Sequence, residues 1–172
     1  SLTQNEERLH ITRADILRQN ANRDKNALQC IAIVPVRGAK IDPRQQALRP
    51  IGGRPLVEWT VDAALAAQRV THVLVSSPDK AVLNHIEKRY EGNVMTVERA
   101  WNLALPNVPL SDTLTHAFEE FPEHCRDFDS IAILPIESPF RTARYIDMAL
   151  DVMDIFETNR VFGVRKVNDN FF

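Results

Sequence analysis

Cysteine, aromatic residues and an excess of charge of either sign are all scarce in this sequence of 172 residues. It contains two cysteines, and 7% of its residues are aromatic. Two cysteines do not make a disulfide framework, so we expect a reducing, cytoplasmic location. Lysine and arginine total 21 against 23 acidic residues, a formal charge of −2. This balance gives no electrostatic basis for a general nucleic-acid-binding protein.

Long hydrophobic runs are also lacking. No apolar stretch of the sequence approaches the roughly 18–20 residues that cross a bilayer, so no membrane partner is expected. The first ten residues, SLTQNEERLH, are polar and acidic, which is unlike a signal peptide. Hydrophobic residues nevertheless make up 44% of the chain. The chain can therefore bury a core, and wholesale disorder is excluded.

Several well-known functional motifs are missing as well. The first apolar run is not followed by G-x-G-x-x-G, and the sequence contains neither G-x-x-x-x-G-K-[ST] nor G-x-S-x-G. These absences argue against a dinucleotide-binding fingerprint, a P-loop and a nucleophile elbow. The five histidines show no zinc-ligand spacing with one another or with the cysteines.

What is present is an alternation of short apolar runs and amphipathic segments. The pattern predicts strands over 28–36, 70–76, 93–97, 130–134 and 160–164, and helices over 56–67, 78–90, 111–121 and 142–156. For the second helix, Ser77 is the predicted N-cap and Pro78 the first helical residue. The alternation predicts a Rossmann-like three-layer α/β/α fold with a mostly parallel sheet. Ligands bind such sheets at the carboxyl ends of the strands.

The amino-terminal residues differ from the rest. Residues 1–26 are polar, and Thr12-Arg13-Ala14-Asp15 resembles a capping box before a short helix that ends near Gln19. We therefore expect residues 1–26 to be an appendage and residues 27–172 to be one α/β domain.

The loop after the first predicted strand concentrates positive charge. Arg37, Lys40 and Arg44 fall within eight residues, and Gly38 allows a tight turn or a close approach to a ligand. A nucleoside triphosphate needs such fixed cations and backbone amides. The spacing fits a phosphate-binding loop and a solvated basic loop equally well.

Five segments in order resemble one family. They are AIVPVRGAK followed by IGGRPLVEWTVDAAL, then HVLVSSPDKAVLNHIEKRYEGNV, VERAWNLA, the pair Asp112 and His116, and ESPFRTARYIDMAL. Together they resemble the acylneuraminate cytidylyltransferases, the CMP-sialic acid synthetase group, over about residues 30–167. The resemblance implies a fold of the nucleotide-diphospho-sugar transferase type. It also implies transfer of CMP from CTP to a nonulosonic sugar acid, release of pyrophosphate, magnesium as cofactor and a homodimer.

The same resemblance assigns roles to residues. Arg37 and Lys40 match the catalytic positions of the phosphate-binding signature. Ser138 and Arg141 fall where the sugar acid is expected. The expected nucleotide- and phosphate-binding residues are Arg37, Gly38, Ala39, Lys40, Arg44, Gln46, Arg99 and Asp112. No metal ligand is assigned, because the chain is expected to end before the family's acidic metal-binding pair.

Departures from the family pattern leave three readings open. Gln45 replaces the second lysine of the signature, Pro109 replaces a serine, and Pro135 replaces the glutamine that reads the cytosine. Proline offers neither a side-chain donor nor a backbone N–H. The chain is therefore either an active cytidylyltransferase or a catalytically impaired binding or regulatory module. A transferase that uses another nucleotide or sugar is the third reading.

Three side chains have a structural reading beside the functional one. Asp112 favours the dipole of a helix start whether or not it meets a nucleotide. Arg141 either binds a ligand or pairs with Asp147 or Glu137. Glu137 stands in the place of a family threonine, where a carboxylate either holds magnesium or repels phosphate.

Overall fold

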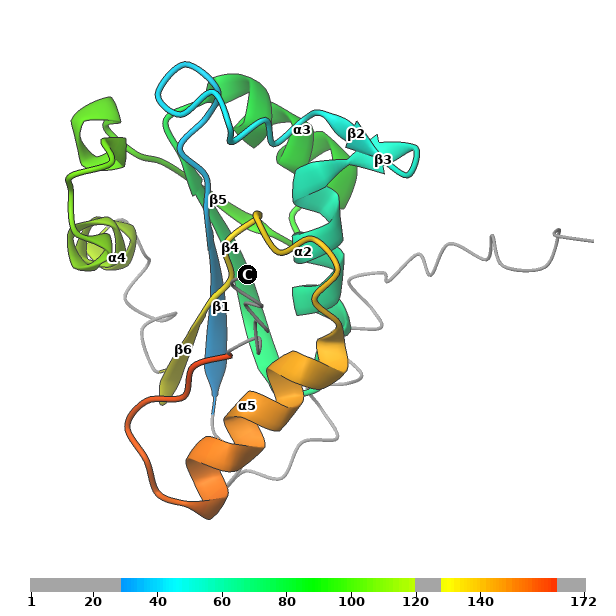
Figure 1. Cartoon of the computed structure of the whole chain (residues 1–172), viewed down its shortest axis with the longest axis vertical. Coiled ribbons are helices and arrows are strands. Elements are labelled where there is room, and N and C mark those ends of the chain that lie inside the picture. Colours follow the sequence, from blue (N-terminus) through cyan, green and yellow to red (C-terminus); the bar gives the residue numbers. More distant parts are fainter. Residues whose placement is uncertain (1–28, 120–127, 164–172) are drawn as a thin grey trace, which may run out of the picture.

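The computed structural model describes residues 29–119 and 128–163. Its main sheet contains four parallel strands in the order β5-β4-β1-β6. These strands are β1 (Cys30–Pro35), β4 (Val70–Ser77), β5 (Met95–Glu98) and β6 (Ser130–Ile133). A two-stranded antiparallel hairpin, β2 (Pro50–Ile51) and β3 (Arg54–Pro55), stands beside this sheet (Figure 1). Parallel pairing leaves the carboxyl ends of all four strands at one edge.

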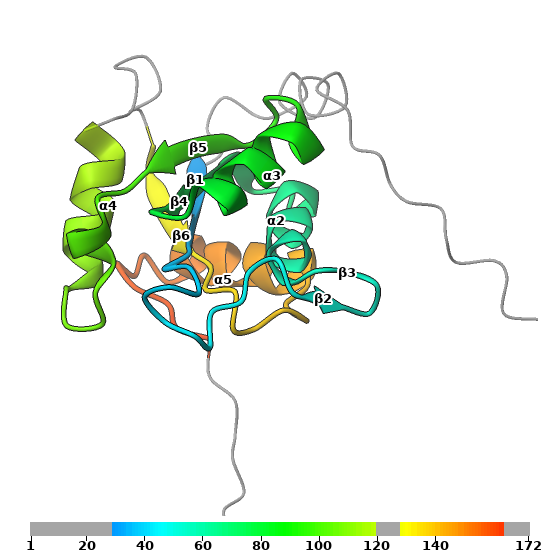
Figure 2. The ribbon, with the colours of Figure 1, turned by 90° about the horizontal axis from the view of Figure 1, so that it is seen from above.

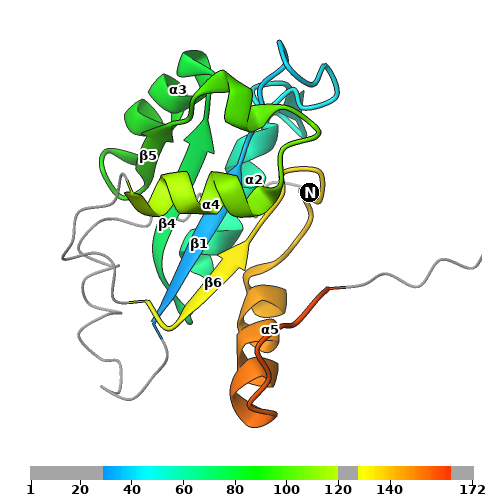
Figure 3. The ribbon, with the colours of Figure 1, turned by 90° about the vertical axis from the view of Figure 1, so that its left-hand side faces the viewer.

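Helices cover both faces of the sheet, which confirms the predicted three-layer α/β/α fold. The helices α2 (Leu56–Ala66), α3 (Lys80–Tyr90) and α5 (Ala143–Ile155) lie on one face, and α4 (Leu110–Glu119) lies on the other (Figure 2). A short 3-10 helix, η1 (Trp101–Ala104), precedes α4. In Figure 3, α4 runs across the sheet in front of β1 and β4.

The side chains of β1 alternate between two cores. Cys30, Ala32 and Val34 pack with α2, α3 and α5, while Ile31 and Ile33 pack with Leu74 and the α4 side. All five β1 residues are fully buried. A strand that is covered on both faces needs an unbroken apolar run, which is why its sequence predicted a buried strand.

Several boundaries differ from the prediction, and four elements show this most clearly. β4 extends to Ser77, because Ser77 pairs with Glu98 of β5. The helix α3 therefore begins at Lys80, and its N-cap is Asp79, whose side chain accepts a hydrogen bond from the Ala81 N–H. The helix α4 begins at Leu110, upstream of the expected cap Ser111. β5 spans Met95–Glu98, two residues later at its start than the predicted strand.

The predicted last strand was wrong over the residues that the structure describes. Residues 160–163 form no strand, and Val164 lies outside the described residues. The expected appendage 1–26 and the end of the third predicted helix, beyond residue 119, also lie outside them.

Candidate active site

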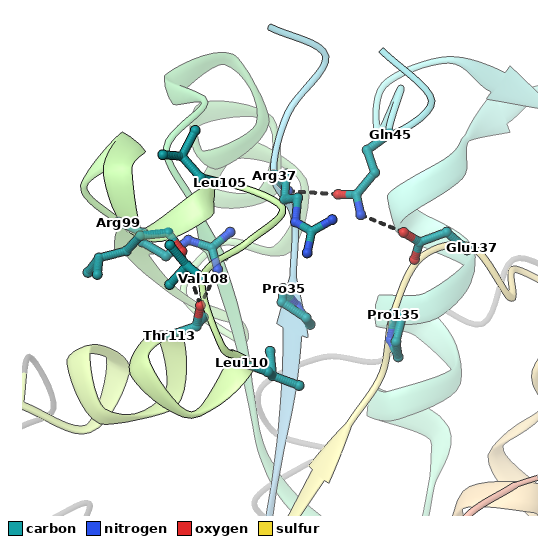
Figure 4. Close-up of a pocket in the computed structure, with 11 residues that line it drawn as sticks. Pro35, Arg37, Gln45, Arg99, Leu105, Val108, Leu110, Thr113, Pro135 and Glu137 are labelled. Carbon is teal, nitrogen blue, oxygen red and sulfur yellow. Dashed lines mark hydrogen bonds between the residues drawn. The ribbon is translucent and has the colours of Figure 1, made fainter. Parts of the chain in front are cut away.

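A cavity of about 200 Å³ opens at the carboxyl edge of the sheet. Its floor comes from Pro35 and Pro135, at the ends of β1 and β6 (Figure 4). One wall is apolar and comes from η1 and the segment up to α4. The remaining lining is polar. The lining residues are Pro35, Arg37, Gln45, Arg99, Leu103, Leu105, Val108, Leu110, Thr113, Pro135 and Glu137. The cavity lies where ligands bind open parallel sheets.

The loop after β1 owes its shape to Gly38. Its φ of +83° is in the left-handed region that favours glycine, and its carbonyl accepts hydrogen bonds from the N–H groups of Ile41 and Asp42. A Cβ at this position would lie 3.0 Å from the Cβ of Asp79. Gly38 therefore allows the loop to turn tightly against the start of α3.

Arg37 and Arg99 form the cationic end of the cavity. Arg99 is 3% exposed, and its guanidinium donates hydrogen bonds to Thr113 Oγ1 at 2.8 Å and to the carbonyl of Val36 at 2.9 Å. Its Nε is buried without a hydrogen-bond partner, and no carboxylate of the described residues forms an ion pair with it. Burial, with a smaller effect of repulsion by Arg37, lowers the pKa of Arg99 to about 10. A buried cation in such a setting favours binding of an anion.

The other basic residues of the loop face away from the cavity. Arg44 donates two side-chain hydrogen bonds to Asp42, and its own side chain is 88% exposed. These bonds hold the pKa of the Asp42 carboxyl below its usual value. Lys40 is exposed and does not line the cavity. The cations that the sequence grouped in one loop are therefore split, with Arg37 alone on the cavity side.

Gln45 joins the two sides of the cavity edge. It is 6% exposed, and its Oε1 accepts a hydrogen bond from the N–H of Arg37 at 2.7 Å. Its Nε2 donates to Oε1 of Glu137, which follows β6. The sequence marked this glutamine only as a departure from the family pattern. Its partner is 92 residues away, so no local signal predicted the contact.

The remaining predicted site residues lie around the cavity rather than in its lining. Arg141 is partly buried, and its guanidinium donates to the carbonyl of Pro135 at 3.4 Å. Burial lowers the pKa of Arg141, and nearby Glu137 raises it. The ion pair of Arg141 with Asp147 that was one alternative is not formed, because the Asp147 carboxylate accepts hydrogen bonds from the N–H groups of Gln68 and Arg69.

Four further predicted residues are exposed, in addition to Lys40 and Arg44. Gln46 donates a side-chain hydrogen bond to the carbonyl of Pro43, and Asp112 accepts one from the hydroxyl of Ser111 in the first turn of α4. Ala39 and Ser138 are exposed in loops after β1 and β6. None of the four lines the cavity. Sequence reasoning did not predict the apolar wall or the position of Thr113 in the lining. The leucines and the valine that follow Arg99 in the sequence could have indicated the apolar wall.

The described residues do not form a dedicated metal-binding site. No group of three or more histidine, cysteine, aspartate or glutamate side chains gathers within the described ranges 29–119 and 128–163. Glu137 is the carboxylate that lines the cavity. Mg²⁺ commonly binds through one or two carboxylates together with substrate phosphates. The cavity therefore fits a magnesium ion only as a companion of a bound polyphosphate.

Comparison with known proteins identifies the class of this fold. Residues 31–102 match the model of the cytidylyltransferase family. CMP:2-keto-3-deoxy-manno-octonic acid synthetase complexed with CTP is structurally similar, with a TM-score of 0.59, 17% identity and coverage of 74% of this chain and 48% of that one. A 4-diphosphocytidyl-2C-methyl-D-erythritol synthase from Anaerococcus prevotii gives a TM-score of 0.54 at 13% identity, covering 85% and 62%. This chain therefore shares the α/β fold of these two enzymes.

A sequence relative agrees with the match to the cytidylyltransferase model. CMP-N,N'-diacetyllegionaminic acid synthase of Legionella pneumophila is 27% identical over 126 residues, which are 73% of this chain and 53% of that protein. The relative and the family model both support the resemblance to cytidylyltransferases that the sequence indicated. This chain spans about half the length of that relative. In the described part, no helix is long and apolar enough to cross a membrane.

Proposed function

We propose that this protein transfers CMP from CTP to a sialic-type sugar acid and releases pyrophosphate. The observation that carries the proposal is the guanidinium of Arg99, which is buried and forms no ion pair with a described carboxylate. It lies beside Arg37 at the carboxyl ends of the strands, in a domain that matches the cytidylyltransferase model. A cytidylyltransferase must bind a polyanion, and this end of the cavity supplies the positive charge. The Legionella relative and the CTP-bound neighbour support the nucleotide and the class of acceptor.

In this mechanism the chain acts by binding and positioning. Arg37 and Arg99 hold the phosphates and offset the charge that develops on the leaving pyrophosphate. The apolar wall of Leu103, Leu105 and Val108 excludes water from one side of the nucleotide. A magnesium ion that arrives with CTP would supply further charge neutralisation between the phosphates.

Pyrophosphate release from CTP and Mg²⁺ tests this proposal. The acceptors are N-acetylneuraminic acid, N,N'-diacetyllegionaminic acid and 2-keto-3-deoxy-manno-octonic acid. We expect release with a sialic-type acid, and a decrease of about 10²-fold or more in kcat/KM for Arg37→Ala. Arg49→Ala is the matched control, because Arg49 is exposed near the same loop and does not line the cavity. The absence of release with all three acids, or equal rates in both variants, would refute the proposal.

A non-catalytic nucleotide-binding module is the second candidate. The specific observation in its favour is Pro135, which lines the cavity where the family reads cytosine and whose carbonyl is taken by Arg141. Calorimetry with CTP, CDP and CMP separates the two candidates. Binding of CTP without any turnover would favour the module.

We also propose a homodimer formed through the outer face of α5. Tyr145, Met148, Val152 and Ile155 recur at helical spacing on this face and are exposed. Together with the exposed Phe140, Phe156 and Phe162 they are large apolar side chains that are each 37–77% exposed. At roughly 150–250 Å² for one whole side chain, their exposed area is about 700–1,100 Å². A standard interface buries about 800 Å² on each partner, so a second copy fits this area.

Light scattering across a dilution series tests the dimer. We expect the wild type to be dimeric and a variant that combines Met148→Lys with Ile155→Lys to be monomeric. Lys88→Glu, an exposed change on α3 and away from this surface, should leave the dimer intact. A wild-type protein that is monomeric at every concentration would exclude this interface.

A further inference from the structure

Glu137 is exposed and presents its carboxylate at the edge of the cavity. Its Oε1 accepts the hydrogen bond from Gln45 Nε2, and no hydrogen bond or ion pair engages its Oε2 within the described residues. Figure 4 shows Gln45 and Glu137 on the side of the cavity opposite to Arg99. The cavity therefore has a cationic end and, across from it, one available carboxylate oxygen.

The orientation of the Glu137 carboxylate depends on the loop that follows β1, through Gln45. The N–H of Arg37 fixes the Oε1 of Gln45, so the amide nitrogen of the same side chain must face Glu137. Gln45 is buried, which restricts its freedom to rotate. The chain of hydrogen bonds from Arg37 through Gln45 to Glu137 couples the position of the carboxylate to that of the loop that follows β1.

Arg141 lies close to Glu137 and adds a positive charge. It comes from the same loop after β6, and its guanidinium is half-buried against the carbonyl of Pro135. The two charged groups do not form an ion pair in the structure. In the cyclic form of a 2-keto sugar acid, one carbon carries both a hydroxyl and a carboxylate. A separated guanidinium and carboxylate match these two groups.

We propose that Glu137 accepts the proton of the attacking sugar hydroxyl, with Gln45 as its positioning residue. This inference rests on the proposed CMP transfer. As the hydroxyl oxygen forms a bond to the α-phosphorus of CTP, its proton passes to Oε2 of Glu137. The bond between the α-phosphorus and the oxygen that bridges to the β-phosphate breaks, and pyrophosphate leaves with that electron pair. Glu137 then returns the proton to water.

Glu137→Gln is the direct test, because it keeps the shape of the side chain and removes its ability to take a proton. We expect kcat to fall about 10²–10⁴-fold, as for the loss of a general base. The KM for CTP should stay within about threefold, because the phosphates bind at Arg37 and Arg99. The decline of log kcat at acidic pH should disappear. Glu98→Gln, which alters an exposed surface glutamate, is the matched control and should match the wild type.

Two further variants keep the inference falsifiable if Glu137→Gln is poorly folded. Glu137→Asp retains a carboxylate at a greater distance and should lose less of kcat. Gln45→Leu removes the amide donor that holds the carboxylate, so kcat should fall while the KM for CTP stays within about threefold. A purely structural role of Gln45 would change kcat and KM together. Circular dichroism and thermal unfolding of each variant check the fold.

Each outcome supports or overturns the inference. An unchanged kcat in Glu137→Gln overturns it while leaving CMP transfer intact. So does restoration of the lost rate by higher Mg²⁺, because that result assigns Glu137 to the metal instead. If the wild type turns over none of the acids, the proposed function itself fails and the inference fails with it. Loss of kcat with unchanged magnesium dependence and a lost acidic limb supports it.

Discussion

Replacing Arg99 by methionine tests whether the buried guanidinium is the main anion-binding group of the cavity. Arg99 is held by Thr113 and by the carbonyl of Val36, and it forms no ion pair with a described carboxylate. Methionine has a similar length and fills irregular apolar space. The variant therefore removes the charge while leaving most of the packing in place.

The expected magnitude follows from mass action. At a CTP concentration about 100-fold above Kd, binding stabilises the folded protein by about 2.7 kcal/mol. For a chain of this size, ~1 kcal/mol corresponds to about 2–4 °C, so the wild-type Tm should rise by about 5–10 °C. Loss of a charged hydrogen bond costs about 1.5–3 kcal/mol, which raises Kd about 10–150-fold. At the same CTP concentration the shift in Arg99→Met should fall to about 1–5 °C.

Differential scanning fluorimetry with CTP and Mg²⁺ measures both shifts. The ligand-induced difference is compared rather than the absolute Tm, because the substitution also leaves the carbonyl of Val36 without its donor. Arg49→Met is the control, since Arg49 is exposed and outside the cavity lining. An Arg99→Met protein that keeps the full CTP-induced shift, or an Arg49→Met protein that loses it, would refute the assignment of this cavity to the phosphates.

Three further outcomes are expected. Gly38→Ala should lower the free energy of unfolding by more than Gly53→Ala in chemical denaturation, because both glycines have positive φ but only the first Cβ would meet another side chain; left-handed strain alone costs about 1–2 kcal/mol. Arg69→Ala should lower Tm by a few degrees, since its guanidinium bonds two carboxylates of α5, and equal Tm values would contradict this clamp. The lowered pKa of Asp42 means that its bond to Arg44 stabilises the fold above the carboxyl's ordinary pKa of 3.8 and is lost as the pH falls through the lower, folded-state pKa. The acid limb of stability should therefore flatten in Asp42→Asn, and an unchanged limb in an acid titration would argue against the bond.

The four strands of the main sheet could be predicted from the sequence because each depends on a local pattern of apolar residues. The fifth predicted strand, over 160–164, was wrong over its described residues. The run from Cys30 to Pro35 is apolar at every position, and a strand that is covered on both faces requires this. Strand and helix alternation then predicted the parallel sheet and placed the candidate site at its carboxyl edge. Predicted boundaries were wrong where pairing with another strand extends an element. Ser77 pairs with β5, so β4 continues to this residue and α3 begins at Lys80.

The sequence alone thus determined the α/β architecture, the sheet edge at which the candidate cavity lies and the presence of Arg37 and Arg99 near it. Only the tertiary structure decided which charges face the cavity. Arg99 reaches the carbonyl of Val36, 63 residues away, and Gln45 reaches Glu137 across 92 residues. Lys40, although it shares a loop with Arg37, faces the solvent. Periodic burial is encoded locally, whereas the direction of a loop side chain depends on backbone turns and on partners that folding brings from distant parts of the chain.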